Sequence, residues 1–299
     1  MIRVANAPCS WGALEFEEAG EAVGWDRVLD EIAATGYAGT ELGDWGFMPS
    51  EPRRLRDELD RRGLELLGAF VPAALWRADA LDEAVHAALR AARLLADVSR
   101  DEPVIVLSDD NATVPDRAAR AGRVRPEDGL DDARWTRFAE GAGRVSWHVR
   151  RETGLRTVFH PHCGGYVEAA WEIEALMSRT AGDELGLCLD TGHVTFGGGD
   201  PMAVFERYAA RVWHVHFKDC SPAIADRARA EGWDYLRAVR EGVFCELGRG
   251  GVDFRRVLDA LQLRGYERWI VVEQDVLPGM GAPALSAARN RSYLRQLGL

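Results

Sequence analysis

The chain has 299 residues, 47% of them hydrophobic and 28% charged, a composition that suits a globular protein with a large buried core. Its formal net charge of −11 disfavours nucleic acid and anionic membrane surfaces as partners. The 5 cysteines are scattered without a CxxC pair, and no apolar run reaches the ~18 residues of a membrane helix, so we expect a cytoplasmic protein without disulfides.

Short apolar or β-branched segments alternate along the chain with segments of helical period. The predicted strands are, in order, residues 2–6, 38–42, 64–70, 103–107, 156–160, 185–190, 212–217 and 268–273. Several are apolar throughout, which is typical of parallel strands buried on both faces. Among the predicted helices, residues 82–97 carry an apolar stripe from Val85 to Ala96. Another helix is expected to begin after an N-cap at Ser50 and to end at Gly63.

Eight strand–helix units in about 300 residues, with no Pro/Ser-rich linker, predict one α/β domain over residues 1–299, a (β/α)8 TIM barrel. An open doubly wound sheet is the alternative, but no GxGxxG segment follows the first strand. Long polar loops are expected at 108–132 and 219–250, after the fourth and seventh strands. Such loops usually shape the site of a barrel, and here they could also form a homo-oligomer interface.

Histidines and carboxylates cluster at the predicted strand ends. The histidines are His160, His162, His193, His214 and His216, and the carboxylates are Glu41, Asp190 and Glu273. The carboxyl ends of barrel strands meet at one mouth, so we expect these side chains to lie together. Imidazole and carboxylate ligands without a thiolate pair suit a divalent cation. The alternatives are a purely structural polar cluster and, for Asp190 alone, a helix cap.

Six segments resemble, in order and spacing, the xylose-isomerase-like barrels of the sugar phosphate isomerase/epimerase superfamily. They are GYAGTELG, FHPHCGGYVE, LCLDTGHVTFGGGDP, HVHFKD, GVDF and WIVVEQD. The combination of DTGH, HxHxKD and a glutamate in strand eight is more specific for the superfamily than for a substrate. Within it the chain is most similar to the inosose dehydratases, so the resemblance implies a lyase of carbohydrate and inositol catabolism.

The resemblance also implies one divalent metal, held by the ends of strands five to eight. Asp190, His216 and Glu273 match the family's ligands. The strand-five ligand is usually glutamate, whereas this chain has His160 there and His162 two residues later, and either could bind. Mn²⁺ or Co²⁺ is expected first, with Zn²⁺, Mg²⁺ or Fe²⁺ as alternatives.

A mechanism follows from the resemblance. The metal would chelate a ketone oxygen and a neighbouring hydroxyl of a keto-polyol and stabilise the enediolate that forms when the α-proton leaves. Glu273 would be the base, and a protonated His162 or His193 would help hydroxide depart in a β-elimination of water. Lys218 would balance negative charge. The residues expected to contact substrate are Trp11, Glu41, His162, His193 and Lys218.

Three other functions stay open at this point. An aldose–ketose isomerase or ketose epimerase, similar to hydroxypyruvate isomerase, would use the same barrel and metal. A non-catalytic sugar-binding barrel would need no base. An abasic-site endonuclease would need three metals and a basic DNA face, which the net charge of −11 disfavours.

Overall fold

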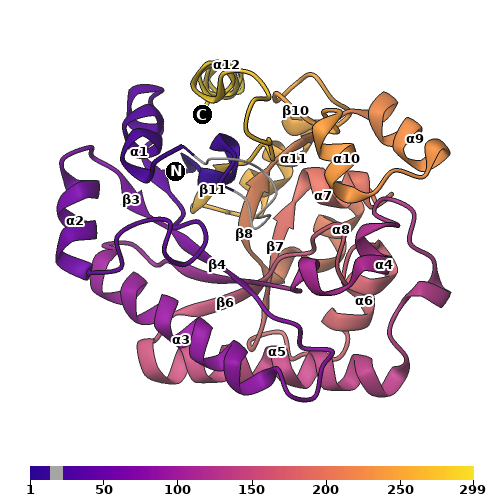
Figure 1. The fold of residues 1–299 in the computed structure, drawn as a ribbon. Coiled ribbons are helices and arrows are strands. Elements are labelled where there is room, and N and C mark those ends of the chain that lie inside the picture. Colours follow the sequence, from indigo (N-terminus) through magenta and orange to yellow (C-terminus); the bar gives the residue numbers. More distant parts are fainter. Residues whose placement is uncertain (14–22) are drawn as a thin grey trace.

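The computed structural model describes residues 1–13 and 23–299, which form a parallel sheet surrounded by helices (Figure 1). The strands of this sheet are β1 Arg3–Asn6, β2 Gly39–Thr40, β3 Glu65–Leu66, β4 Gly68–Pro72, β5 Val104–Ser108, β6 Arg156–Phe159, β7 Gly186–Asp190, β8 Val212–Phe217 and β11 Trp269–Val272. Each of the eight predicted strands is therefore confirmed, with bounds that match or differ by one or two residues, and the third is divided into β3 and β4.

The sheet closes into a barrel. Its strand order is β3-β2-β1-β11-β8-β7-β6-β5-β4, and every neighbouring pair is parallel. The two ends of this order, β3 and β4, are separated in the chain only by Leu67, so they form one bent strand that joins β2 on one side and β5 on the other. The prediction of a (β/α)8 TIM barrel is confirmed.

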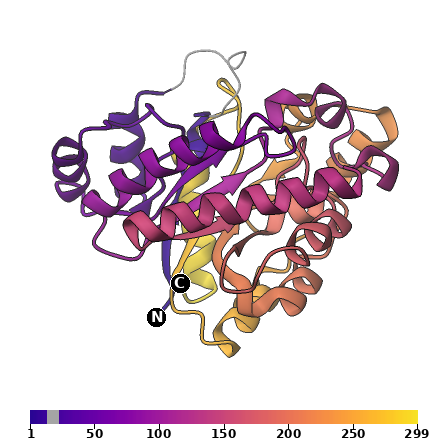
Figure 2. The same ribbon diagram turned by 90° about the horizontal axis from the view of Figure 1, so that it is seen from below.

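Helices cover the outside of the barrel. They include α1 Trp25–Ala34, α2 Pro52–Asp60, α3 Leu81–Val98, α5 Asp132–Thr153, α6 Ala170–Met177, α8 Pro201–Tyr208, α11 Phe254–Leu263 and, after the last strand, α12 Pro283–Gln296. The short helix α7 Thr191–Phe196 begins directly at the carboxyl end of β7. The long helices α3 and α5 run side by side (Figure 2). Among the described residues, no helix is both long enough and apolar enough to cross a membrane.

Two details of the predicted helices are wrong. The N-cap of α2 is Glu51 rather than Ser50, because the Glu51 carboxylate accepts the N–H groups of Arg53 and Arg54 just after Pro52. In α3, Ala96 is exposed. The buried face of α3 is instead Ala84, Ala88, Leu89, Ala91, Ala92, Leu94, Leu95 and Val98, a broader stripe that packs on both the barrel and α5.

The two predicted polar loops contain ordered elements. Residues 108–132 include the short helix α4 Pro115–Ala118. Residues 219–250 form a helical excursion, with a small hairpin of β9 Asp219–Cys220 and β10 Phe244–Cys245 around α9 Pro222–Glu231 and α10 Tyr235–Arg240. This excursion has its own apolar cluster, which includes Trp233, Tyr235, Val239 and Phe244 and is separate from the main core. Within it the buried residues of α10, Tyr235, Ala238 and Val239, follow the i, i+3, i+4 spacing of a helix.

Candidate active site

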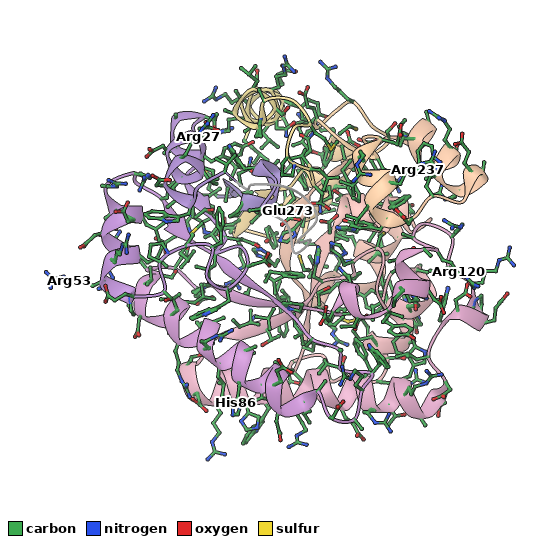
Figure 3. The ribbon with its side chains drawn as sticks, in the orientation of Figure 1. Arg27, Arg53, His86, Arg120, Arg237 and Glu273 are labelled. Carbon is green, nitrogen blue, oxygen red and sulfur yellow. The ribbon has the colours of Figure 1, made fainter. Side chains whose placement is uncertain are left out.

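The predicted polar residues meet at the carboxyl ends of the strands. They are Glu41 after β2, His160 and His162 after β6, Asp190 at the end of β7, His193 in α7, His214 and His216 in β8, Lys218 after β8 and Glu273 after β11, and all are buried. The parallel register brings them together, because His216 pairs with Asp190 on one side and with Val271 on the other. Glu273 lies near the centre of the molecule in Figure 3, far from the labelled surface arginines.

Asp190 caps a helix and also faces the cluster. Its Oδ1 accepts the backbone N–H of His193 at 2.7 Å, which caps the first turn of α7. Its Oδ2 lies 3.4 Å from Nε2 of His160 and 3.7 Å from Nδ1 of His216. The two interpretations of Asp190 from the sequence are therefore compatible, since each carboxylate oxygen has a separate role.

Four side chains fit a single metal ion. His160, Asp190, His216 and Glu273 each offer a ligand atom within 4.8 Å of the others, and Nδ1 of His216 lies 3.2 Å from Oε2 of Glu273. Ligand atoms about 2.1 Å from one cation lie roughly 3.0–3.5 Å apart when they occupy adjacent coordination positions. This group of four contains His160 and not His162. The sequence left both histidines as possible ligands from the fifth strand.

The electrostatics of the site also favour a cation. The site holds four buried carboxylates, those of Glu41, Asp190, Glu273 and Asp275, and one buried ammonium, that of Lys218, a formal charge of −3 before any imidazole is protonated. Burial alone would lower the pKa of His216, but its acidic neighbours, Cys188 first and then Glu273 and Glu41, raise it well above its ordinary value. The negative formal charge of the site is costly to bury without compensation. A divalent cation would reduce it to −1, so both the donor set and the charge fit the expected metal.

Glu41 lies beside the four candidate metal ligands, which we call the metal cluster, and it contacts two histidines. Its Oε1 lies 2.6 Å from Nε2 of His214 and 3.0 Å from Nε2 of His216. Burial alone would raise the pKa of Glu41, but the imidazoles of His216 and His214 lower it well below its ordinary value. A carboxylate that accepts the Nε2 proton of His216 leaves Nδ1 free for a metal, and this Nδ1 is buried without a hydrogen-bond partner.

Lys218 connects the metal cluster to a second group of polar residues. Its Nζ lies 2.8 Å from Oδ1 of Asp275, 2.9 Å from Nε2 of His193 and 3.1 Å from Oε2 of Glu273. Burial alone would lower the pKa of Lys218, but the surrounding carboxylates, Asp190 first, raise it well above its ordinary value. The hydroxyl of Tyr235, at the start of α10, donates to the other oxygen of Asp275 at 2.8 Å.

Asp275 and Tyr235 were not predicted. Asp275 stands two residues after Glu273, so strand alternation could have pointed to it. Tyr235 gives no such signal, because its position depends on how the helical excursion folds.

The surroundings of His162 and His193 disfavour their protonated forms. Burial lowers the pKa of His162 well below its ordinary value, and the neighbouring His193 and His160 lower it further. Burial also lowers the pKa of His193, and Lys218 adds to the effect. These directions argue against the protonated imidazole expected from the sequence. Another unpredicted residue, Asn111, contacts the Nδ1 of His162 with its side-chain nitrogen at 2.6 Å.

Trp11 lies away from the site. Its indole is 2% exposed, and its N–H donates to Glu31 at 2.6 Å. The neighbouring residues Pro8 and Cys9, rather than Trp11, line the cavity beside the metal cluster. The structure therefore gives the expected stacking on Trp11 no support.

We call the cavity over the metal cluster the chamber. It is lined by Ala7, Pro8, Cys9, Ala13, Glu41, Gly43, Asp44, Phe70, His160, His162, His216, Lys218, Glu273 and Asp275. The chamber thus combines carboxylates, imidazoles and one ammonium with a single aromatic wall, Phe70. Such a lining suits a small molecule rich in hydroxyl groups.

Comparison with known proteins identifies the family. A family model described as xylose isomerase-like TIM barrel matches residues 19–297. The chain belongs to the xylose isomerase-like TIM barrel family. It is 32% identical to an inosose dehydratase of Lacticaseibacillus casei over 98% of this chain and 96% of that protein. It is 33% identical to the rhizopine catabolism protein MocC of Rhizobium meliloti over 99% of this chain and 88% of that protein.

Solved structures show the same barrel. The probable 3-DHS dehydratase AsbF of Bacillus anthracis is 15% identical, with a TM-score of 0.69 over 98% of this chain and 99% of that one. An L-ribulose 3-epimerase is 17% identical, with a TM-score of 0.69 over 99% of this chain and 94% of that one. Because the chain belongs to this family and is similar to inosose dehydratases over nearly its whole length, it is an enzyme, either a lyase or a sugar isomerase or epimerase.

Proposed function

We propose that the protein is a divalent-metal-dependent lyase that removes water from a keto-polyol of the inosose type. The observation that carries the proposal is the buried cluster of His160, Asp190, His216 and Glu273, whose charge and spacing suit one cation beside a chamber for a small polyol. The similarity to inosose dehydratases over nearly the whole chain favours dehydration over isomerisation.

When bound, the metal would supply a Lewis acid that polarises the ketone of the substrate. Glu273 lines the chamber, so its carboxylate is placed to take the α-proton as the carbon–hydrogen electrons form the new double bond. The carbon–oxygen bond to the β-hydroxyl then breaks, and the leaving oxygen takes a proton from the enzyme to depart as water. The unsaturated product rearranges to a dione.

The proton for the leaving hydroxyl comes from the Lys218–His193 pair in this proposal. Nζ of Lys218 and Nε2 of His193 are 2.9 Å apart, and Lys218 lines the chamber. Burial lowers the pKa of His162 and disfavours the imidazolium there, whereas the surrounding carboxylates keep Lys218 as an ammonium. The same carboxylates make that ammonium a weak acid, and a bound cation that neutralises Asp190 and Glu273 would ease the donation. Asp275 fixes the ammonium from the other side.

The test uses purified protein with inosose and a single added metal, Mn²⁺ or Co²⁺. We expect near one equivalent of bound metal, and an ultraviolet band that grows as the dione forms. Asp190→Asn should lose both the metal and the band, whereas Asp200→Asn, a helix cap distant from the chamber, should keep both. A reversible reaction without the band would favour an isomerase or epimerase, and full turnover without metal would refute the proposal.

A further inference from the structure

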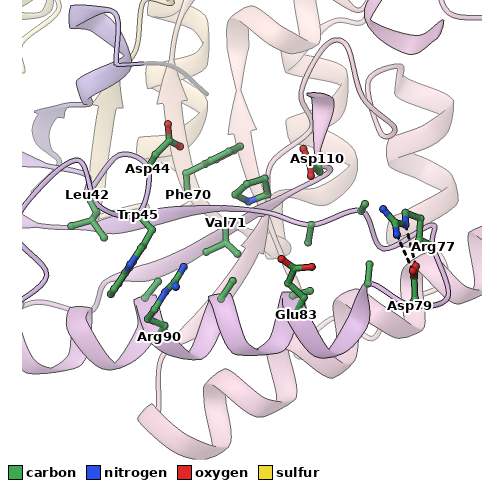
Figure 4. A pocket seen from close by; sticks show the side chains of 17 residues that line it. Leu42, Asp44, Trp45, Phe70, Val71, Arg77, Asp79, Glu83, Arg90 and Asp110 are labelled. Carbon is green, nitrogen blue, oxygen red and sulfur yellow. Dashed lines mark hydrogen bonds and ion pairs between the residues drawn. The ribbon is translucent and has the colours of Figure 1, made fainter. Parts of the chain in front are cut away.

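A groove of about 540 Å³ adjoins the chamber (Figure 4). It lies between the end of β4, the segment after β2 and helix α3, and it shares Asp44 and Phe70 with the lining of the chamber. Its volume is within the range of about 300–1,000 Å³ that is usual for small-molecule sites. Asp44 and Phe70 lie on one side of β4 in Figure 4 and Trp45, Val71 and Arg90 on the other, so a ligand that occupied both the chamber and the groove would pass beside Phe70.

The floor of the groove is apolar and is formed by small side chains. Ala84, Ala87 and Ala91 lie on one face of α3, because they are three and four residues apart, and they face Val71 of β4. Their small side chains leave the space that larger residues on this face would fill. The floor offers a flat apolar surface to one side of a ring.

The rim of the groove carries an aromatic ring and charged groups. Trp45 is 37% exposed, and the guanidinium of Arg90 lies 4.3 Å from the centroid of its indole. The carboxylates of Asp44 and Glu83 also line the groove. Carboxylates accept hydrogen bonds from hydroxyls and a guanidinium donates to them, while an indole packs against the C–H face of a saturated ring.

The charge of the rim excludes anionic ligands. Asp44, Asp79, Glu83 and Asp110 outnumber Arg77 and Arg90, and Arg77 is already paired with Asp79 at 2.8 Å. Arg90 is the remaining cation of the rim, and it packs on Trp45. A phosphate or carboxylate would meet net repulsion here, so a neutral, hydroxyl-rich ring fits better than a sugar phosphate.

We propose that the groove is a second sugar subsite, which holds a neutral pyranosyl group attached to the keto ring that reacts in the chamber. The substrate class is then a glycosylated keto-polyol or keto-sugar, in addition to the free ring. This inference rests on the proposed dehydration, because the chamber must hold the reacting ketone. It goes further in assigning Trp45, Arg90 and Glu83 to recognition of the second ring.

The experiment compares two substrates, a free keto-inositol and the same keto-inositol bearing one pyranosyl group on an oxygen remote from the reacting carbons. Two variants damage the groove by different means. Trp45→Ala removes the aromatic wall, and Ala87→Leu fills the floor while keeping a strong helix former. Their controls are Trp147→Ala, an exposed tryptophan of α5, and Ala96→Leu, an exposed position of the same helix α3.

We expect the ratio of kcat/KM for the glycosylated ring to that for the free ring to fall at least tenfold in both groove variants and to stay within twofold in both controls. An unchanged ratio in Trp45→Ala and Ala87→Leu, with normal turnover of the free ring, overturns the subsite and leaves the proposed function intact. If neither ring is turned over, the proposed dehydration fails instead. The subsite is then judged by calorimetric titration with a neutral disaccharide, whose binding must weaken at least fivefold in Trp45→Ala. Equal or absent binding overturns it.

Discussion

Removal of one hydroxyl, in Tyr235→Phe, tests whether the helical excursion positions the proton donor. The hydroxyl donates to Asp275 at 2.8 Å, and Asp275 holds the ammonium of Lys218 with its other oxygen at 2.8 Å. A hydrogen bond to a charged acceptor contributes about 1.5–3 kcal/mol to stability. Only the fraction of this free energy that holds Lys218 in its catalytic position affects kcat. If the substitution raises the activation free energy by about 1.4 kcal/mol, kcat falls about tenfold.

The assay is a double-mutant cycle with Lys218→Met, in which kcat and KM are measured for each variant after loading with metal. If Tyr235 acts through Lys218, then Tyr235→Phe should cost less than twofold in kcat once Lys218 is absent. Tyr37→Phe is the matched control, because it removes a buried hydroxyl that bonds to the carbonyl of Ala287. Additive losses in the double variant would refute the reasoning, as would an unchanged kcat in Tyr235→Phe.

Three further outcomes are expected. Glu41→Gln should weaken metal binding about 10–100-fold, because Glu41 orients His216, and an isotherm that matches wild type would contradict this role. Chelation by EDTA should lower Tm by several degrees, since a metal present at 100 times its Kd adds about 2.7 kcal/mol of stability, and an unchanged Tm would argue that no metal binds. Burial raises the pKa of Glu168 to about 7, so the folded state holds this proton more tightly than the unfolded state. That contribution is complete below pH 4.5 and is lost as the pH rises through 7. Between pH 5 and 8 the wild type should therefore lose about 2.5 kcal/mol relative to Glu168→Gln in urea unfolding, and parallel pH profiles would contradict the assignment.

The sequence predicted the barrel and most of the metal cluster for one physical reason. Parallel strands must end at the same edge, so polar residues after buried strands, such as Asp190 and Glu273, are brought together whatever the helices do. The sequence could not say which of His160 and His162 lies beside Asp190, because both follow the same strand and only the backbone after Phe159 decides which imidazole faces that carboxylate.

Residues held by tertiary packing escaped prediction. Tyr235 reaches the site only because α9 and α10 fold over the barrel, and the helical spacing of Tyr235, Ala238 and Val239 indicates a helix but not where that helix packs. Trp11 was expected at the mouth because it follows the first strand. The chain turns there into the helix Pro8–Trp11, which directs the indole to Glu31.

The separate apolar cluster of the excursion has a consequence for how this enzyme could diversify. The wall that contains Tyr235 rests on Trp233, Val239 and Phe244, whereas the metal ligands stand on strands anchored in the main core. Substitutions of Trp233, Val239 or Phe244 would therefore act on the chamber through Tyr235 and its hydrogen bond to Asp275, while the strands keep their packing in the main core. Selection or engineering can therefore vary the packing behind Asp275 separately from the strands that carry the candidate metal ligands.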